Sequence, residues 1–470
     1  MRHRMRALAA VVAAAGLACG AAAPAYAGPA PAAARAQADI LDRLRALPDV
    51  ISVEERSAPE GYRYFVVAFR QRVDHRDPSA GTFTQRYTVL HRDDDRPTVL
   101  HTSGYNVSLS GSRSEPTRLV DGNQISTEQR FFTPSRPDPA DWTDLDIWQA
   151  ATDHHRILAG LKTVYSGKWI STGASKGGMT SIYHRRFYPR DVDGTVAYVA
   201  PNDVIDSEDR ADIRFFDTVG TDRACRADLK ALQVEALKRR GEIVDRYEAW
   251  AAENGRTFEN TIGSADRAYE MLVLDTPWAF WQYQTQAKCA DVPKPDASTD
   301  MFWAFLDEVS GFDFYTDEGT EPYIPYYYQA GTQLGAPSVP TRHLRGRLRY
   351  RDLYQPRSYV PRDIPMRFDH RAMPDVDHWV RTRGSELLFV YGANDPWGAE
   401  PFRLGRGTRD SLWYTVTGGN HGANIAQLPE AQRANATTAL RRWAGVPSVA
   451  RLSEPKLIPG FDETLKRHPL

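Results

Sequence analysis

Three side chains in this sequence have the types and the order that nucleophilic catalysis requires. Ser175 lies in the segment GASKG at residues 173–177, which fits the pattern Gly-x-Ser-x-Gly. A serine hydroxyl is a poor nucleophile near neutral pH, so it needs a base that takes its proton and a carboxylate that orients the base. His421, among glycines, and Asp395, before a proline, follow it in the chain. They are the candidates for these two roles.

The residues around Ser175 predict a strand, a sharp turn and a helix. Residues 168–172 predict a short strand, and residues 179–188 predict a helix that ends before Pro189. Another strand is expected at residues 195–200, which completes a βαβ unit and requires a parallel sheet covered by helices. The turn would present Ser175 beside a helix N-terminus, where developing negative charge is stabilised. The alternative is an ordinary glycine-rich turn.

The two partner residues each follow a predicted strand. Asp395 comes after residues 386–391, and His421 comes after residues 411–416. Catalytic groups in open α/β sheets lie beyond the carboxyl ends of the strands, so we expect the three side chains to meet there. The order serine, acid, histidine is that of the α/β-hydrolase fold. We therefore predict this fold, a mostly parallel sheet flanked by helices, although Asp395 or His421 alone could be a loop residue.

A tetrahedral intermediate would need two hydrogen-bond donors for its oxyanion. The backbone N–H of Lys176 is one candidate, because it follows the nucleophile directly. The other is the backbone N–H of Tyr105, in the loop after a predicted strand at residues 98–101, where a glycine permits close approach. A plain turn is the alternative for that loop.

The remaining chain predicts further strands, a helix and a large insertion. Strands are expected at residues 62–69 and 85–91, and a helix is expected at residues 144–164 with Asp144 as N-cap. Residues 205–340 form a mainly helical cap in this prediction, between core segments 28–204 and 341–470. The aromatic side chains of residues 276–328 could line a substrate pocket or pack as the core of the cap.

The N-terminus has the pattern of a secretory signal peptide. A basic start precedes an alanine-rich apolar run, and Ala-Tyr-Ala at residues 25–27 is a cleavage signal, so residues 1–27 would be removed on export. A membrane anchor is the weaker alternative, because the run is short and Pro24 ends it. We expect a secreted protein without a membrane anchor. The net charge of −1 gives no footprint for nucleic acid.

Cysteine usage fits export and gives no metal site. Of three cysteines, Cys19 lies in the predicted signal, which leaves Cys225 and Cys289. Two cysteines in an exported protein favour one disulfide over two free thiols. No zinc-binding pattern occurs, so neither a metal nor a cofactor is expected.

Several short motifs resemble one family of serine peptidases. They are similar to segments of the Pro-X carboxypeptidase and dipeptidyl peptidase II group, and most similar to the secreted tripeptidyl aminopeptidases of actinobacteria. The matching segments are FRQRVDH at residues 69–75, GTFTQRY at 81–87, EQRFF at 128–132 and YQ at 328–329. The resemblance covers roughly residues 60–430. It implies an exopeptidase that acts on peptide substrates near a free chain end.

Within this resemblance, Glu128 occupies a family position near the active site. A carboxylate there could hold the ammonium group of a substrate N-terminus, and the alternative is a structural ion pair with Arg130 or a nearby arginine. Gln129 stands where the group has histidine, and residues 133–135 also depart from its pattern. The resemblance therefore does not decide which end of the substrate is recognised.

Together these features predict a secreted serine exopeptidase that releases tripeptides from free N-termini. The alternatives are a prolyl-specific peptidase that removes dipeptides or C-terminal residues, a lipase or esterase on the same fold, and an inactive binding protein. The sequence gives no oligomeric state.

Overall fold

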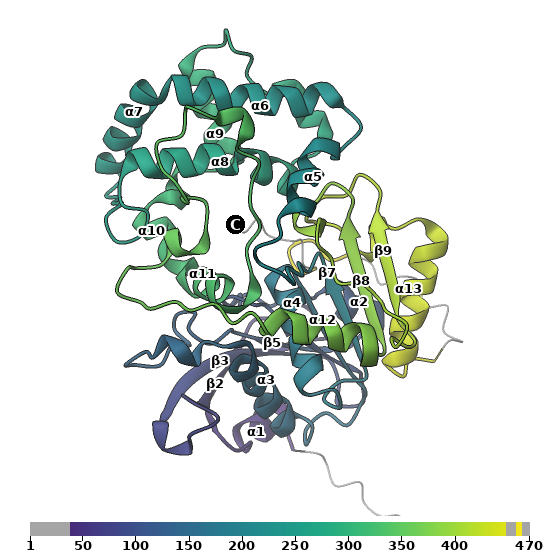
Figure 1. Ribbon diagram of the computed structural model, residues 1–470. Coiled ribbons are helices and arrows are strands. Elements are labelled where there is room, and N and C mark those ends of the chain that lie inside the picture. Colours follow the sequence, from purple (N-terminus) through teal and green to yellow (C-terminus); the bar gives the residue numbers. More distant parts are fainter. Residues whose placement is uncertain (1–37, 448–456, 463–470) are drawn as a thin grey trace, which may run out of the picture. The chain divides into compact units, whose positions relative to one another are not determined.

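The computed structural model describes residues 38–447 and 457–462. In these residues nine strands form one sheet in the order β1-β2-β3-β5-β4-β6-β7-β8-β9 (Figure 1). The strands are β1 Val50–Arg56, β2 Arg63–Arg72, β3 Thr82–His91, β4 Thr98–Thr102, β5 Asn123–Thr127, β6 Trp169–Ala174, β7 Gly194–Tyr198, β8 Leu387–Gly392 and β9 Leu412–Val416.

The sheet is parallel from β5 to β9 and antiparallel from β1 through β3 to β5. Crossovers between parallel strands require intervening helices, which cover the faces of the sheet. The α-helices are α1 Ile40–Arg45, α2 Glu115–Val120, α3 Ile147–Leu161, α4 Lys176–Phe187, α5 Arg210–Thr218, α6 Arg223–Lys238, α7 Arg240–Glu253, α8 Ala265–Tyr283, α9 Thr299–Val309, α10 Asp317–Thr320, α11 Ile324–Gln329, α12 Ala372–Arg383 and α13 Glu430–Trp443.

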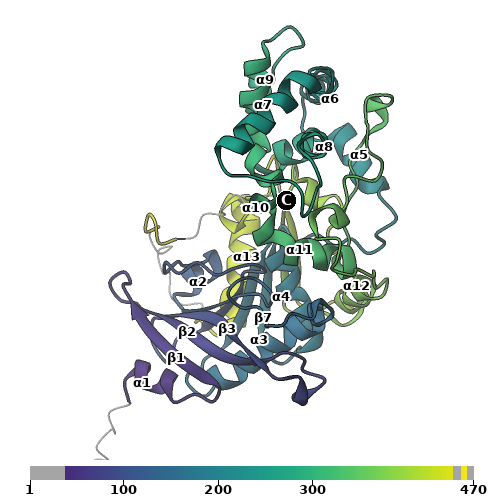
Figure 2. The ribbon, with the colours of Figure 1, turned by 90° about the vertical axis from the view of Figure 1, so that its left-hand side faces the viewer.

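Helices pack on both faces of the central strands (Figure 2). Val196 of β7 packs in a cluster with α2 and α13, whereas its neighbour Ala197 packs in a cluster with α3, α4 and α12. The same split separates Leu388 from Phe389 in β8. Because successive side chains of a strand point to opposite faces, an unbroken apolar run marks a strand buried on both sides. These layers confirm the predicted α/β-hydrolase fold.

The helices α5 to α11 lie between β7 and β8 in the chain and form the upper part of Figure 1. Their buried side chains belong to one apolar cluster, which also includes Tyr105 and Phe132. Most aromatic rings of residues 276–328 pack in this cluster, but Tyr283 and Tyr326 line a cavity. Both interpretations of these rings therefore hold in part. The limits of a separate cap domain stay a prediction.

A disulfide joins Cys225 of α6 to Cys289, with 5.3 Å between their Cα atoms. It closes a loop of the helical region around α7 and α8. No helix of the described residues is long and apolar enough to cross a membrane. The predicted signal peptide, residues 1–27, lies outside the described residues.

One local expectation was wrong, and one strand of the parallel region was missed. Asp146, not Asp144, is the N-cap of α3, because the Asp146 carboxylate accepts a hydrogen bond from the N–H of Gln149 while Asp144 ends a 3₁₀ turn. Strand β5 was not predicted, because its buried side chains are mostly polar and hide the usual apolar pattern. The side chain of Gln124, for example, bonds to Ser112 and Ser126.

Candidate active site

Ser175 lies on a sharp turn between β6 and α4, as the sequence predicts. Its backbone angles, φ 55° and ψ −127°, lie outside the regions that residues with a side chain favour. Such a backbone conformation persists only where the surrounding structure fixes it. The Ser175 N–H donates to the carbonyl of Tyr198 in β7, and the Ser175 carbonyl accepts from Met179 in α4. The backbone is therefore held from both sides while the side chain stays at the sheet edge.

The glycines beside Ser175 are required by contact rather than by flexibility. A Cβ at Gly177 would lie 2.3 Å from the Thr102 carbonyl oxygen, and one at Gly173 would lie 2.3 Å from the Gly177 carbonyl oxygen. The backbones of strand β4 and helix α4 thus touch, and the Thr102 hydroxyl also donates to the Gly177 carbonyl. This close packing lets the N-terminus of α4 point at the site.

Asp395 and His421 meet at the same edge of the sheet. His421 Nδ1 lies 2.8 Å from Asp395 Oδ2, and both side chains are buried. The other oxygen of Asp395 accepts the N–H of Trp397 at 3.1 Å. A Cβ at Gly392, the last residue of β8, would lie 2.3 Å from the Asn420 carbonyl oxygen. The loops after β8 and β9 therefore pack closely enough to hold the pair together.

This contact fixes the tautomer of His421. An ionised carboxylate only accepts hydrogen bonds, so the proton must be on Nδ1 and Nε2 carries the lone pair. Nε2 is buried and has no hydrogen-bond partner in the described part of the chain. The cap holds the ring in place, because the N–H of His421 donates to the carbonyl of Gln282 in α8 at 2.9 Å. His421 thus presents an unpaired basic nitrogen.

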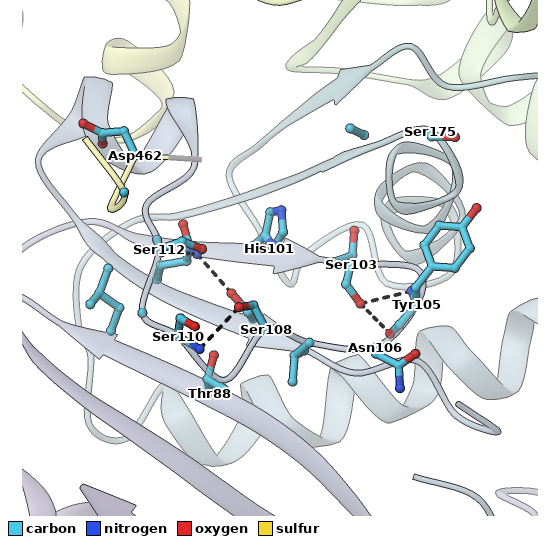
Figure 3. A pocket seen from close by; sticks show the side chains of 18 of the residues that line it. Thr88, His101, Ser103, Tyr105, Asn106, Ser108, Ser110, Ser112, Ser175 and Asp462 are labelled. Atoms are coloured by element: carbon cyan, nitrogen blue, oxygen red, sulfur yellow. Dashed lines mark hydrogen bonds between the residues drawn. The ribbon is translucent and has the colours of Figure 1, made fainter. Parts of the chain in front are cut away.

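The side chain of Tyr105 lies beside Ser175. Figure 3 shows the Tyr105 ring with its oxygen towards Ser175, and both residues line the same cavity. No hydrogen bond joins Ser175 to His421 among the described residues. Such bonds are often loose without substrate and tighten in the reacting complex. Ser175 and His421 nevertheless line the same cavity.

Tyr105 enters the site through its side chain and not through its backbone. Its N–H lies 3.1 Å from Ser103 Oγ, to which it donates, so the predicted backbone donor already has a partner. Burial raises the pKa of the Tyr105 hydroxyl well above its usual value, so the group stays protonated and remains a donor. The other predicted donor, the N–H of Lys176, begins α4, where no carbonyl of the same helix can pair with it.

The cavity has a volume of about 780 Å³. Ser175, Tyr105 and His421 line it together with Gln282 and Tyr283 of the cap. Its wall away from Ser175 combines apolar side chains with hydroxyl groups, and serine side chains lie near Asp462 of the C-terminal segment (Figure 3). The hydroxyls there are Ser108, Ser110, Ser112, Ser126 and Thr88. A space of this size, apolar with a few polar groups, suits a peptide segment.

The arrangement can perform acyl transfer. His421 Nε2 can take the Ser175 proton, Asp395 stabilises the resulting imidazolium, and the Lys176 N–H with the Tyr105 hydroxyl can stabilise an oxyanion. A family model described as PS-10 peptidase S37 matches residues 32–463. The chain belongs to the PS-10 peptidase S37 family. The sequence prediction of a serine peptidase is thereby confirmed.

A similar curated protein is the prolyl tri/tetrapeptidyl aminopeptidase of Streptomyces mobaraensis. It is 60% identical over 436 residues, which cover 92% of this chain and 91% of that protein. Among solved structures, a proline iminopeptidase of Mycobacterium smegmatis is 13% identical, with a TM-score of 0.34 and coverage of 84% of this chain and 99% of its own. The peroxisomal α/β-hydrolase Lpx1 of Saccharomyces cerevisiae is 9% identical, with a TM-score of 0.35 and coverage of 85% and 94%.

Glu128 does not lie in the cavity of this family member. It is 0% exposed, and Oε1 lies 2.5 Å from Arg86 Nη2 while Oε2 accepts the hydroxyl of Ser135. The N–H of Val107 also donates to Oε1. With both oxygens occupied, the carboxylate has no place for a substrate ammonium. The geometry therefore favours the structural ion pair, with Arg86 as the partner.

Two features of the site were missed in the sequence. The Lys176 ammonium is buried without a hydrogen-bond partner in the described residues, 5.7 Å from the Tyr105 ring centroid, and burial lowers its pKa to about 7. Only its backbone drew attention, because its position in the motif concerns the N–H. The Tyr105 hydroxyl was missed because no sequence pattern tells which way a loop side chain points.

Tyr105→Phe should lower kcat about 10- to 100-fold with little change in KM, because it removes one donor to the oxyanion and no other contact of the substrate. Steady-state kinetics on a chromogenic peptide measure this. An unchanged kcat would exclude the hydroxyl from the reaction.

Glu128→Gln should lower the free energy of unfolding by about 3 kcal/mol, because it leaves the partly buried Arg86 guanidinium without its partner. Denaturant unfolding measures this. The ratio of kcat/KM for peptides with free and acetylated N-termini should stay unchanged. A loss of that preference with unchanged stability would restore the ammonium-binding role.

Proposed function

We propose that this chain is a secreted serine exopeptidase that releases peptides of three or four residues from free N-termini. The observation that carries the proposal is the His421–Asp395 hydrogen bond beside Ser175, in a cavity large enough for a peptide. The name of the Streptomyces mobaraensis relative, a prolyl tri/tetrapeptidyl aminopeptidase, supports the product length and the N-terminal direction.

The proposed reaction begins when the Ser175 hydroxyl donates a hydrogen bond to His421 Nε2. His421 Nε2 takes the hydroxyl proton as the oxygen attacks the scissile carbonyl, and Asp395 holds the imidazolium at Nδ1. The tetrahedral oxyanion accepts hydrogen bonds from the Lys176 N–H and the Tyr105 hydroxyl. His421 then gives its proton to the leaving amine, and the C-terminal part of the substrate departs.

Water completes the proposed cycle. His421 removes a proton from a water molecule that attacks the acyl-enzyme, and the second tetrahedral intermediate uses the same two donors. Collapse returns the proton to Ser175 and frees the short N-terminal peptide. Each protein group therefore acts twice, and no metal or cofactor is invoked.

Secretion is part of the same proposal. Residues 1–27 have the composition of a signal peptide, and the disulfide suits an oxidising compartment.

Ser175→Ala should reduce hydrolysis about 10³- to 10⁶-fold, because it removes the nucleophile and leaves only binding and the oxyanion donors. Mass spectrometry of products from a mixed peptide set tests the direction of cleavage. N-terminal tri- and tetrapeptides are expected. Release of single residues or of C-terminal fragments would contradict the proposal, and the Ser175→Ala protein serves as the control for contaminating peptidases.

Expression of the full chain in a secreting host tests export. The mature protein should begin at Gly28, as N-terminal sequencing of the culture medium would show. Retention of the first residues in a cell-bound protein would overturn this part of the proposal.

A further inference from the structure

A second, smaller pocket adjoins Ser175 on the side of the loop after β7. It shares Ser175, Tyr326 and Trp397 with the large cavity. Its volume is about 30 Å³, which accommodates a group the size of a water molecule or an ammonium ion and not a large side chain. The other residues that line it are Lys176, Met179, Pro201, Asn202, Asp203, Asp212, Trp278, Leu334, Gly335, Pro337 and Glu400.

Three carboxyl groups from distant segments converge on this pocket. Asp203 follows β7, Asp212 lies in α5, and Glu400 follows β8. No ion pair joins any of them to lysine, arginine or histidine among the described residues, whose ion pairs all involve other carboxylates. The nearby charges that act on these three come from Asp206, Asp209 and Glu208, which are also acidic.

Burying three carboxyl groups near one another costs folding free energy. Burial, followed by the charge of Asp206, raises the pKa of Asp203 to about 7. Burial, followed by the charge of Glu400, raises the pKa of Asp212 to about 8. Burial also raises the pKa of Glu400. Buried like charges without a counter-ion destabilise a fold, so the protein tolerates here a strain that a bound cation would relieve.

Four further polar atoms of the residues that line the pocket are buried and without hydrogen-bond partners in the described part of the chain. Asn202 is 3% exposed, and its Nδ2 donates to Asp377 at 3.0 Å while its Oδ1 has no partner. The indole N–H groups of Trp278 and Trp397 also have none. The fourth is the Lys176 ammonium, which lies over the Tyr105 and Phe132 rings. Unpaired buried polar groups are rare in folded proteins, and beside the carboxyl groups this lining adds one acceptor and two indole donors.

This polarity matches the first residue of a peptide, which carries a cationic donor next to a carbonyl acceptor. We propose that the pocket binds the substrate's α-ammonium group through Asp203, Asp212 and Glu400, with Asn202 Oδ1 as a further acceptor and Trp278 Nε1–H directed at the first carbonyl. The inference rests on the proposed exopeptidase function and names the residues that select a free N-terminus. An ammonium site that is fixed relative to Ser175 would limit cleavage to a narrow range of distances from that end.

The carboxylates can be removed one at a time with little change of shape. The variants are Asp203→Asn, Asp212→Asn and Glu400→Gln, and the matched control is Asp217→Asn, which removes a carboxylate of the same helix α5 that pairs with Lys230 outside the pocket. Each protein is assayed on a peptide with a free N-terminus, on its N-acetylated form and on p-nitrophenyl acetate. The ester reports on the reacting groups without an N-terminus.

We expect each pocket variant to lose about 10- to 100-fold in kcat/KM on the free peptide, as for a lost charged hydrogen bond. Activity on the ester should not change, so the preference for the free over the acetylated peptide should fall. Asp217→Asn should match the unmodified protein in all three assays. An unchanged preference in all three pocket variants would overturn the inference.

Stability gives a readout that a structural role would not share. Because the pKa of Asp212 is raised in the folded state, the unmodified protein loses stability as pH rises from about 4 towards 8, when the carboxyl ionises more readily in the unfolded chain. Asp212→Asn should therefore raise the melting temperature at pH 8 and leave it nearly unchanged at pH 4. A lower melting temperature at pH 8 would indicate a structural role and count against the inference.

The pH dependence of KM gives a third test. The carboxylates must be ionised to bind an ammonium, so KM for the free peptide should rise as pH falls below about 8, and this rise should weaken in Asp212→Asn. The groups that influence the cluster are Asp206, Asp209, Glu208 and Glu400, with His370 acting on Asp206. An identical pH profile of KM in both proteins would also count against the inference.

The controls separate this inference from the proposed function. If the unmodified protein hydrolyses the ester and cleaves no peptide, the exopeptidase proposal fails. If it cleaves free peptides and the pocket variants keep its preference, only the ammonium pocket fails. Should Asp212→Asn not fold, Glu400→Gln carries the same kinetic test, because Glu400 is only half-buried.

Discussion

The hydrogen bond between His421 Nδ1 and Asp395 Oδ2 is the contact on which the rest of the site depends. It fixes the tautomer that leaves Nε2 basic, and it exists only because the loops after β8 and β9 end at one edge of the sheet. Parallel pairing of Gly392 with Val416 sets that register, and the absence of a side chain at Gly392 lets the two loops touch. A carboxylate and an imidazole far apart in sequence thereby become neighbours without any adjustment of their own backbones.

The positions of the parallel strands along the chain are the part of the fold that the sequence predicts most directly. Short strand-like segments marked β6, β7, β8 and β9, and β8 is an almost unbroken apolar run because it is covered on both faces. The residues after such runs must lie at one sheet edge, so Ser175, Asp395 and His421 could be placed together without any distance. Strand β5 was not predicted in this way, because its Asn and Gln side chains are buried and hydrogen-bond to backbone carbonyls of neighbouring loops.

Side-chain direction in loops is the part that sequence does not express. Glu128 and Tyr105 both lie in segments without regular repeat, where neither periodicity nor pairing fixes which way a side chain points. The ion-pair partner of Glu128 is Arg86, which lies in strand β3. The acceptor cluster around Asp212 combines Asp203 and Asp212 with Glu400, which is almost two hundred residues further along the chain. Such sites depend on tertiary packing of the helical insertion, which its own sequence pattern does not determine.

The insertion is therefore not a detachable cover. Its helix α8 supplies the carbonyl that holds the backbone of His421, the ring of Tyr283 at an edge of the imidazole and the buried Trp278 of the smaller pocket. A displacement of α8 would change the orientation of the base and the shape of the pocket at once. Recognition of the substrate end and activation of the nucleophile are thus linked through one helix. A peptide substrate that displaces α8 would therefore also displace His421.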